Sequence, residues 1–291
     1  MKRLLRNILL GCAATVVLGV VVVWIALRGS LPDLDGDLRL AGLTGEVTVV
    51  RDADGVVTVS ASNSVDLAQG TGFAHGQDRF FQMDLLRRKG AGELSALFGE
   101  IALELDKETR THRFRQRALD GIKRLKPVDR SILEAYTRGV NQGLASLTLS
   151  PFEYFLLGVP PEPWRSEDSL LVIFSMYLVL NDSRGHRETA LALLTETLPI
   201  EMVRFLMPEG TSWDAPMEGG ARSAGRIPSA DVFDLRQEGP VDVADINANA
   251  KEPAILLGSN NWAVGKGATG DDRAIIANDM HLPLGVPNTF Y

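Results

Sequence analysis

The chain has 291 residues, of which 45% are hydrophobic and 23% are charged. This composition is typical of a packed globular protein and argues against intrinsic disorder. The formal net charge is −7, and no basic cluster occurs beyond the N-terminus, which argues against a nucleic-acid-binding protein because phosphate binding needs clustered Lys and Arg.

The N-terminus begins with a basic segment and a long apolar run. Lys2, Arg3 and Arg6 precede residues 8–27, which are 20 consecutive uncharged and mostly apolar residues. As a helix, this run can cross a hydrocarbon core of about 30 Å. Acidic residues follow it, so the positive-inside rule places the N-terminus in the cytoplasm. We predict that residues 1–30 form a membrane anchor or signal and that the rest is exported to the periplasmic side of the inner membrane.

Two alternatives for this segment remain open. A cleaved signal peptide, which would leave a secreted protein, has a shorter apolar core of about 7–15 residues and a small-residue cleavage site; residues 26–30 offer only a poor one. Lipid attachment at Cys12 is the other alternative, although few apolar residues precede it. The uncleaved span fits the length best. Because Cys12 is the sole cysteine, we expect no intrachain disulfide in the exported part.

The next segment predicts a hairpin followed by a helix. β-Branched runs at 45–51 and 56–60 flank an Asp-Gly turn, which is a hairpin signal. Apolar residues then recur at helical spacing from Ser64 to about Arg88, which predicts one long helix. It contains three glycines, Gly70, Gly72 and Gly76. Each lowers helix propensity by about 1 kcal/mol relative to Ala, so we expect close backbone packing there.

Four further helices are predicted from one-sided apolar patterns: 106–125, 128–147, 166–181 and 187–198. Residues 208–253 show weak periodicity. This stretch exceeds the loops of about 12–15 residues usual in compact domains, so it is either disordered or functional, for example a segment that is later removed. Strand-like runs at 262–264 and 274–277 predict a second hairpin. The chain ends soon afterwards at Tyr291, and we expect a sequence truncated from a longer protein.

Residues 258–260, Gly-Ser-Asn, end the connector just before this hairpin. Their composition is typical of a turn. Ser259, however, follows a Gly where a chain break would create a new N-terminus at the start of a strand. An α-amine titrates at about 7.7–8.0 and can act as a general base toward the hydroxyl of the same residue. The tripeptide is therefore either a simple turn or the position of a catalytic serine.

The residues around Ser259 carry a family resemblance. Residues 259–262 (Ser-Asn-Asn-Trp), followed by Gly265-Lys266 and by residues 277–282 (Ala-Asn-Asp-Met-His-Leu), resemble the start of the second chain in the penicillin acylase family of N-terminal nucleophile hydrolases. The resemblance implies an α+β fold, the αββα sandwich, of which this chain holds a mostly helical part and a few strands.

Upstream motifs agree with this resemblance. Residues 70–88 resemble the signature helix of the family, residues 92–99 its continuation, and residues 161–164 (Pro-Glu-Pro-Trp) another of its motifs. The similarity runs from about residue 45 to residue 288 in the family's order. It implies a first-chain domain at 31–207, a spacer at 208–258 and the start of the second chain at 259–291.

The resemblance also implies a function. Ser259 would attack the Gly258 carbonyl, so that one precursor cleaves itself into an alpha/beta heterodimer with Ser259 as the new N-terminus. The same serine would then hydrolyse small N-acyl amides, such as a penicillin, a cephalosporin or an acyl-homoserine lactone. The donors that stabilise the oxyanion would lie beyond Tyr291. The alternative is a membrane-tethered, non-catalytic binding protein that keeps the fold and an intact chain.

Four further residues match family positions. His281 stands where the family has a Gln or His whose backbone lies beside the scissile amide; a packing role is the alternative. Asn181 and Asp182 replace the Arg-Phe pair of phenylacetyl-selective members in the acyl pocket, which puts penicillin G-type specificity in doubt. Glu188 matches a calcium ligand, although calcium takes six to eight oxygens and a solvated helix N-terminal Glu fits equally well. No organic cofactor is expected.

Other polar residues are given structural roles. His75 and His112 have no second ligand at metal spacing, so we interpret both as structural. Asp78-Arg79 and Arg87-Arg88 form either an active-site cluster or buried ion pairs, and we favour ion pairs.

Overall fold

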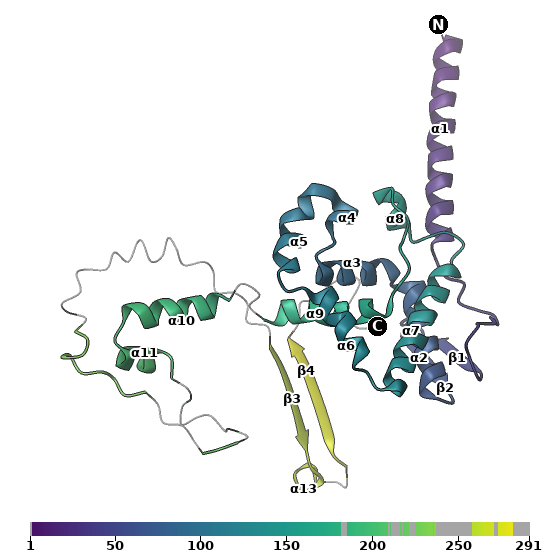
Figure 1. Ribbon diagram of the computed structural model, residues 1–291. Helices are drawn as coiled ribbons and strands as arrows, with labels where there is room; N and C mark the ends of the chain where they lie inside the picture. The colour runs from purple at the N-terminus through teal and green to yellow at the C-terminus, as the bar shows by residue number, and fades with distance from the viewer. Residues whose placement is uncertain are drawn as a thin grey trace. The chain divides into compact units, whose positions relative to one another are not determined.

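A computed structural model describes residues 2–181, 185–208, 258–270 and 273–281, together with parts of the connector at 210, 216, 218–220, 225–234 and 236 (Figure 1). The chain forms two compact units, whose described parts are 2–179 and 180–281. Each unit is described by itself.

The first unit is mostly helical. Its elements are α1 (Lys2–Gly29), β1 (Val47–Arg51), β2 (Val57–Ala61), α2 (Ser64–Asp78), α3 (Phe80–Ala91), α4 (Ser95–Phe98), the 3-10 helix η1 (Gly99–Ala102), α5 (Leu103–Arg110), α6 (Phe114–Lys123), α7 (Pro127–Ala145), α8 (Phe152–Leu157) and α9 (Ser166–Leu180). The second unit contains α10 (His186–Thr197), α11 (Ile200–Leu206), β3 (Gly258–Val264), α13 (Lys266–Thr269) and β4 (Ile275–His281).

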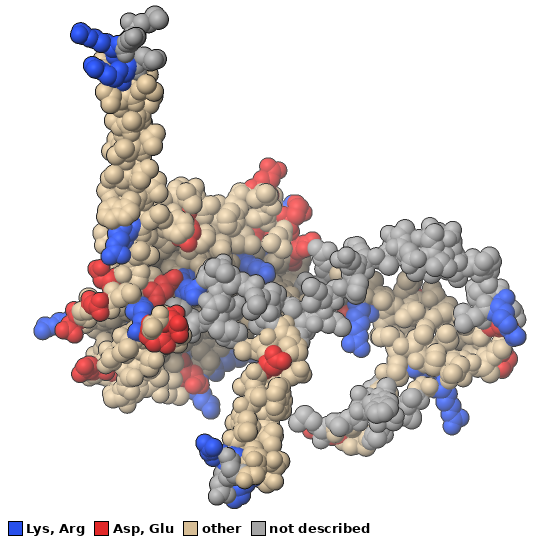
Figure 2. All heavy atoms as spheres, turned by 180° about the vertical axis from the view of Figure 1, so that it is seen from behind, with Lys and Arg blue, Asp and Glu red and all other residues tan. Residues whose placement is uncertain are grey.

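The predicted apolar segment is helical throughout as α1. Within the described residues, one helix, Arg6–Gly29, is long and apolar enough to cross a membrane. Figure 2 shows basic side chains at the two ends of this projecting helix, with uncharged side chains between them. The apolar side chains of α1 are exposed. This agrees with the predicted anchor or signal.

The first predicted hairpin is confirmed. β1 and β2 pair antiparallel, with Val47 opposite Ala61 and Arg51 opposite Val57. The hairpin lies against α2 at Gly70, where an added Cβ would come within 2.6 Å of the Val47 side chain. Gly70 is therefore needed for the close approach of the hairpin to the helix.

Helices α2 and α7 pack with their backbones in close contact, as the glycines predicted. A Cβ added at Gly72 would overlap the carbonyl oxygen of Tyr136, and one at Gly76 would overlap that of Val140. Gly139 of α7 meets the backbone of α2 in the same way. This interface fixes the relative position of α2 and α7, which line one side of a cavity in this unit.

A network of ionised side chains lies in the interior of this unit. Asp84 Oδ1 accepts hydrogen bonds from Nε of Arg87 at 2.7 Å and Nε of Arg88 at 2.8 Å. Its Oδ2 accepts one from the Tyr154 hydroxyl at 2.7 Å. Arg87 also donates to Asp168 of α9 at 2.6 Å. All five residues are buried, which confirms the ion-pair interpretation of the Arg-Arg motif.

Two predicted helices are each broken in two. The expected long helix from Ser64 to Arg88 is α2 and α3, because Arg79 leaves the helical conformation with φ −133° and ψ 11°. At this break, Asp78 forms an ion pair with Arg51 of β1 at 2.9 Å. The expected helix 106–125 is α5 and α6, separated at Arg113, whose φ of 56° is left-handed. The first break thus coincides with a contact to another element. Neither break contains a Gly, Pro or Asn that would predict it from the sequence.

The remaining helix predictions hold within two residues at each end. They correspond to α7, α9 and α10. The short helices α4, α8 and α11 were not predicted, because four to seven residues are too few to show helical periodicity.

Candidate active site

The second hairpin is confirmed and extends to residues 258–260. β3 and β4 pair antiparallel, with Gly258 opposite His281 and Ser259 opposite Met280. The turn interpretation of Gly-Ser-Asn is therefore wrong: Ser259 is the second residue of a strand. Cross-strand pairing, which turn composition does not reveal, determines the conformation here. The register places the predicted processing site and His281 next to each other.

The pairing register also separates Ser259 and His281 by face. Side chains alternate along a strand and directly opposite residues share a face. Ser259 therefore shares its face with Met280, whereas His281 lies on the other face with Asp279. There His281 Nε2 and Asp279 Oδ2 are 2.9 Å apart. The imidazole is thus not aimed at the serine hydroxyl.

Both faces of this hairpin carry exposed apolar side chains. Trp262 is 51% exposed and shares a face with Ile275; Met280 is 50% exposed and shares the other face with Ile276. An isolated two-stranded hairpin is marginally stable in water. Apolar residues on both faces are typical of strands that are covered on both sides. The hairpin thus has the pattern of an inner strand pair in a layered protein.

The other predicted site residues lie along the beginning of the second unit. Asn181 follows the end of α9 and is exposed. Asp182 lies outside the described residues. Glu188 is exposed in the first turn of α10. Among the residues that the structure describes, no three His, Cys, Asp or Glu side chains group as a metal site. Glu188 alone therefore does not make a calcium site in this part of the chain.

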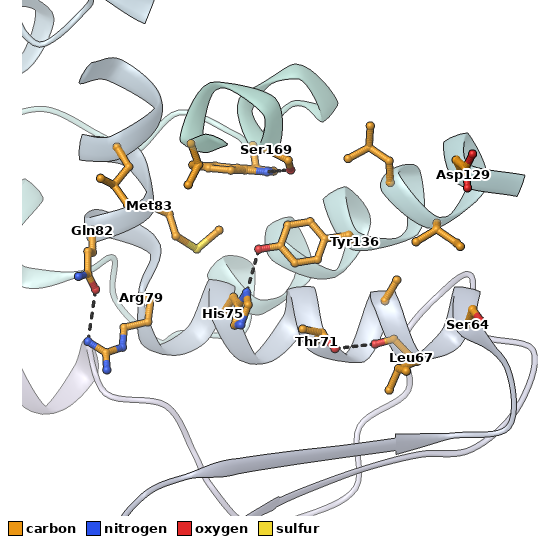
Figure 3. A pocket seen from close by; sticks show the side chains of 16 residues that line it. Ser64, Leu67, Thr71, His75, Arg79, Gln82, Met83, Asp129, Tyr136 and Ser169 are labelled. Atoms are coloured by element: carbon orange, nitrogen blue, oxygen red, sulfur yellow. Dashed lines mark hydrogen bonds between the residues drawn. The ribbon is translucent and has the colours of Figure 1, made fainter. Parts of the chain in front are cut away.

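The first unit contains a cavity of about 820 Å³ between α2, α3, α7 and α9 (Figure 3). Its lining is largely apolar and includes Leu67, Met83, Leu86, Ile132, Leu133, Trp164 and Val172. Such a volume falls within the range usual for small-molecule sites, about 300–1,000 Å³. Sequence reasoning missed this cavity. The available signal was a stripe of α2 residues at a spacing of four, Leu67, Thr71 and His75, facing a similar stripe on α7.

A hydrogen-bonded pair lies in the cavity wall. His75 Nδ1 and the Tyr136 hydroxyl are 2.8 Å apart, and Figure 3 shows the hydroxyl pointing at the imidazole. Burial lowers the pKa of His75 below its ordinary value of 6.5, and burial raises the pKa of Tyr136 to about 12. Both groups are therefore neutral near pH 7. His112 stacks on Phe114, with ring centroids 5.0 Å apart, so both histidines have structural contacts.

Comparisons with known proteins agree with the resemblance. Residues 46–291 match the family model described as penicillin amidase. The penicillin acylase 2 proenzyme of Pseudomonas sp. (strain SE83) is 32% identical over 265 residues, which are 91% of this chain and 34% of that protein. The acyl-homoserine lactone acylase QuiP of Pseudomonas aeruginosa is 30% identical over 270 residues, which are 90% of this chain and 30% of that protein.

A solved structure gives the fold. Thermostable penicillin G acylase from Alcaligenes faecalis aligns with a TM-score of 0.50 and 27% identity, over 61% of this chain and 98% of that chain. This likeness, with the mostly helical elements and two hairpins, confirms the expected α+β fold class of the N-terminal nucleophile hydrolases. The chain spans about a third of the length of the curated relatives it matches.

Proposed function

Because the chain belongs to the penicillin amidase family, we propose that it is part of a self-processing amidohydrolase that cleaves small N-acyl amides. The names of its relatives support this proposal: one is a penicillin acylase proenzyme and another an acyl-homoserine lactone acylase. The observation that carries it is the position of Ser259. It directly follows Gly258 near the start of a strand, inside the segment that matches the family.

In the processing step, Ser259 Oγ attacks the Gly258 carbonyl carbon. The C–N bond of the Gly258–Ser259 peptide breaks, and the hydroxyl proton passes to the leaving nitrogen, which becomes the α-amine of Ser259. Water then hydrolyses the resulting ester to a Gly258 carboxylate and a free hydroxyl. Once released, a serine activated by its own α-amine needs no separate His or Asp, in keeping with an imidazole of His281 on the opposite face of the hairpin.

In turnover, the α-amine accepts the proton of the Ser259 hydroxyl while Oγ attacks the carbonyl of the substrate amide. The proton then passes to the departing amine, and water hydrolyses the acyl-enzyme. A hydrogen-bond donor to the developing oxyanion is usually worth about 2.7–4 kcal/mol; in this proposal such donors come from sequence beyond Tyr291. The backbone of His281, which pairs with Gly258 across the hairpin, would help to position the amide.

Processing divides the chain into a first-chain domain at 31–207, a spacer at 208–258 and a second chain that begins at Ser259. The two products would remain together as an alpha/beta heterodimer. About three fifths of this chain covers almost all of the solved acylase chain, so that solved chain is shorter than this one. This supports a separate first chain.

The proposed substrates are penicillins, cephalosporins or acyl-homoserine lactones. Asn181 and Asp182 are proposed to line the acyl pocket. Glu188 would supply one oxygen to a calcium ion whose other ligands come from outside the described residues. The apolar helix α1 is proposed to hold the enzyme on the periplasmic side of the inner membrane, which its length and flanking charges support.

The test is an assay of the full-length gene product against penicillin G, a cephalosporin and acyl-homoserine lactones of several chain lengths, with the released amine quantified. Ser259→Ala should abolish release. Ser131→Ala, a serine of α7 outside the proposed site, should retain wild-type turnover. If the wild type remains one uncut chain and releases no amine from any compound, the non-catalytic binding protein becomes the better account.

A further inference from the structure

The first unit holds an exposed apolar helix close to the end of α1. Helix α8 is fixed by Tyr154, which is 2% exposed and donates to buried Asp84. Three of its other side chains point outward: Phe152, Phe155 and Leu156 are 40%, 53% and 80% exposed. An exposed cluster of two aromatic rings and a leucine on one helix is typical of a surface that contacts protein or membrane.

The end of α1 is attached to the segment that precedes α8. The Leu149 amide donates to the Gly29 carbonyl at 2.8 Å, and the Ser30 hydroxyl donates to the Ser150 carbonyl at 2.8 Å. A Cβ at Gly29 would come within 2.7 Å of the Leu149 side chain. The folded domain is therefore joined to the anchor helix within a residue or two of its end, not through a long tether.

Chain geometry then limits how far α8 can lie from the membrane. Residues 8–27 fill a core of about 30 Å as a helix, which leaves Arg28 at its edge. Phe152 is two residues beyond Ser150, so their Cα atoms are at most about 7 Å apart. The six residues of α8 extend over about 9 Å. The headgroup region on each side of the core is about 5–7 Å thick, so the start of α8 lies within reach of this layer.

We infer that α8 is a membrane-contact element, whose Phe152, Phe155 and Leu156 insert into the lipid headgroup region beside the anchor helix. The inference rests on the proposed membrane anchoring by α1. Phe and Leu are among the residues that interfacial helices bury at the boundary between headgroups and acyl chains. Leu31 and Leu34, which directly follow α1, are 55% and 57% exposed and would lie at the same level. The anchor and α8 together would hold the domain in one orientation on the bilayer.

The test uses the full-length gene product with Cys12→Ala and no other reactive cysteine, reconstituted into phosphatidylethanolamine and phosphatidylglycerol vesicles. Phe155→Cys and the control Val128→Cys are labelled with an environment-sensitive fluorophore. The two positions are similarly exposed, at 53% and 59%. Val128 lies at the far end of α7, about 26 Å along that helix from the end that leads to Leu149. Nitroxide-labelled lipids should quench the label at 155 several-fold more than the label at 128.

The outcomes separate the inference from the anchoring on which it rests. If the protein floats with vesicles but both labels are quenched equally, the contact of α8 is wrong while the anchoring stands. A label at 155 that is shielded from aqueous iodide but not reached by lipid nitroxides would show that protein covers α8, which also overturns the inference. Failure to float would remove the anchoring itself and the inference with it.

Discussion

At the scale of single residues, the buried carboxylate of Asp84 joins several parts of the first unit. It accepts three hydrogen bonds, from Arg87, Arg88 and Tyr154. Removal of one partner from a buried ionic network leaves uncompensated charge in a medium of low polarity. The two arginines of the Arg87-Arg88 motif thus stabilise this unit by pairing with a buried carboxylate.

Asp84→Asn tests this role. We expect it to lower the free energy of unfolding by about 3–5 kcal/mol, because the buried guanidinium groups of Arg87 and Arg88 lose the carboxylate that they share. Urea unfolding followed by circular dichroism measures the change. Glu104→Gln is the control: its ion pair with Lys107 is largely exposed, so no measurable change is expected. Equal effects of the two substitutions would contradict the account.

His75 gives a prediction for pH. Its folded-state pKa lies below 6.5 because burial disfavours the imidazolium. Below pH 6.5 the unfolded chain therefore binds more protons than the folded protein, and stability falls as pH falls toward the folded pKa. His75→Phe should remove this part of the loss. Urea unfolding of the wild type and of the variant at pH 7.5 and 5.5 measures how much stability each loses. If the free energy of unfolding falls by the same amount in both proteins, His75 is not responsible.

Tyr136→Phe removes the hydroxyl that pairs with His75. A buried ring nitrogen left without this partner costs about 1–3 kcal/mol. Thermal and urea unfolding at pH 7.5 should show a loss of that size. A neutral result would mean that the pair does not stabilise the cavity wall.

At the scale of elements, the helix–helix contact of α2 and α7 depends on glycines. Gly139→Ala would place a Cβ against the backbone of α2, and we expect a loss of about 1–3 kcal/mol from overpacking. Gly121→Ala in α6 is the matched control. Its Cβ would meet a Leu170 side chain at an ordinary 3.4 Å, so the higher helix propensity of Ala should leave stability unchanged or raised.

Elements that show hydrophobic periodicity or turn residues could be predicted from the sequence, whereas features that depend on contacts between elements could not. Both hairpins and the longer helices were predictable from periodicity and turn residues, and the α2 glycines correctly indicated close packing. The break at Arg79 was not, because it coincides with a contact between Asp78 and Arg51 of another element. Arg113 adopts a left-handed conformation although it is neither Gly nor Asn, so the sequence does not indicate the second break.

The candidate site was predictable only in part. Ser259 was found from its place after the connector and from the resemblance. The strand conformation of residues 258–260 and the opposite faces of Ser259 and His281 depend on cross-strand register, which local composition does not encode. The cavity around Tyr136 forms only because α2 and α7 lie side by side. The sequence of either helix alone does not show that they are neighbours.

At the scale of the whole molecule, the chain is about a third of the length of its curated relatives. The β3–β4 hairpin exposes Trp262 and Ile276 at 51% and 74%, on opposite faces. We predict that further strands and layers of the full-length protein cover both. Hydrogen exchange across residues 258–281 should be slow in the full-length protein and fast in a chain that ends at Tyr291. Equally fast exchange in both would contradict the layered fold around this hairpin.

The central claim is that Ser259 is released as an N-terminal nucleophile, and intact-mass spectrometry with N-terminal sequencing tests it most directly. The full-length wild type should yield a second chain that begins Ser-Asn-Asn-Trp, and Ser259→Cys, which keeps a nucleophile, should also be cut. Ser259→Ala should remain one chain. A single uncut chain in the wild type, or a Ser259→Ala variant cut at the same bond, would contradict the account.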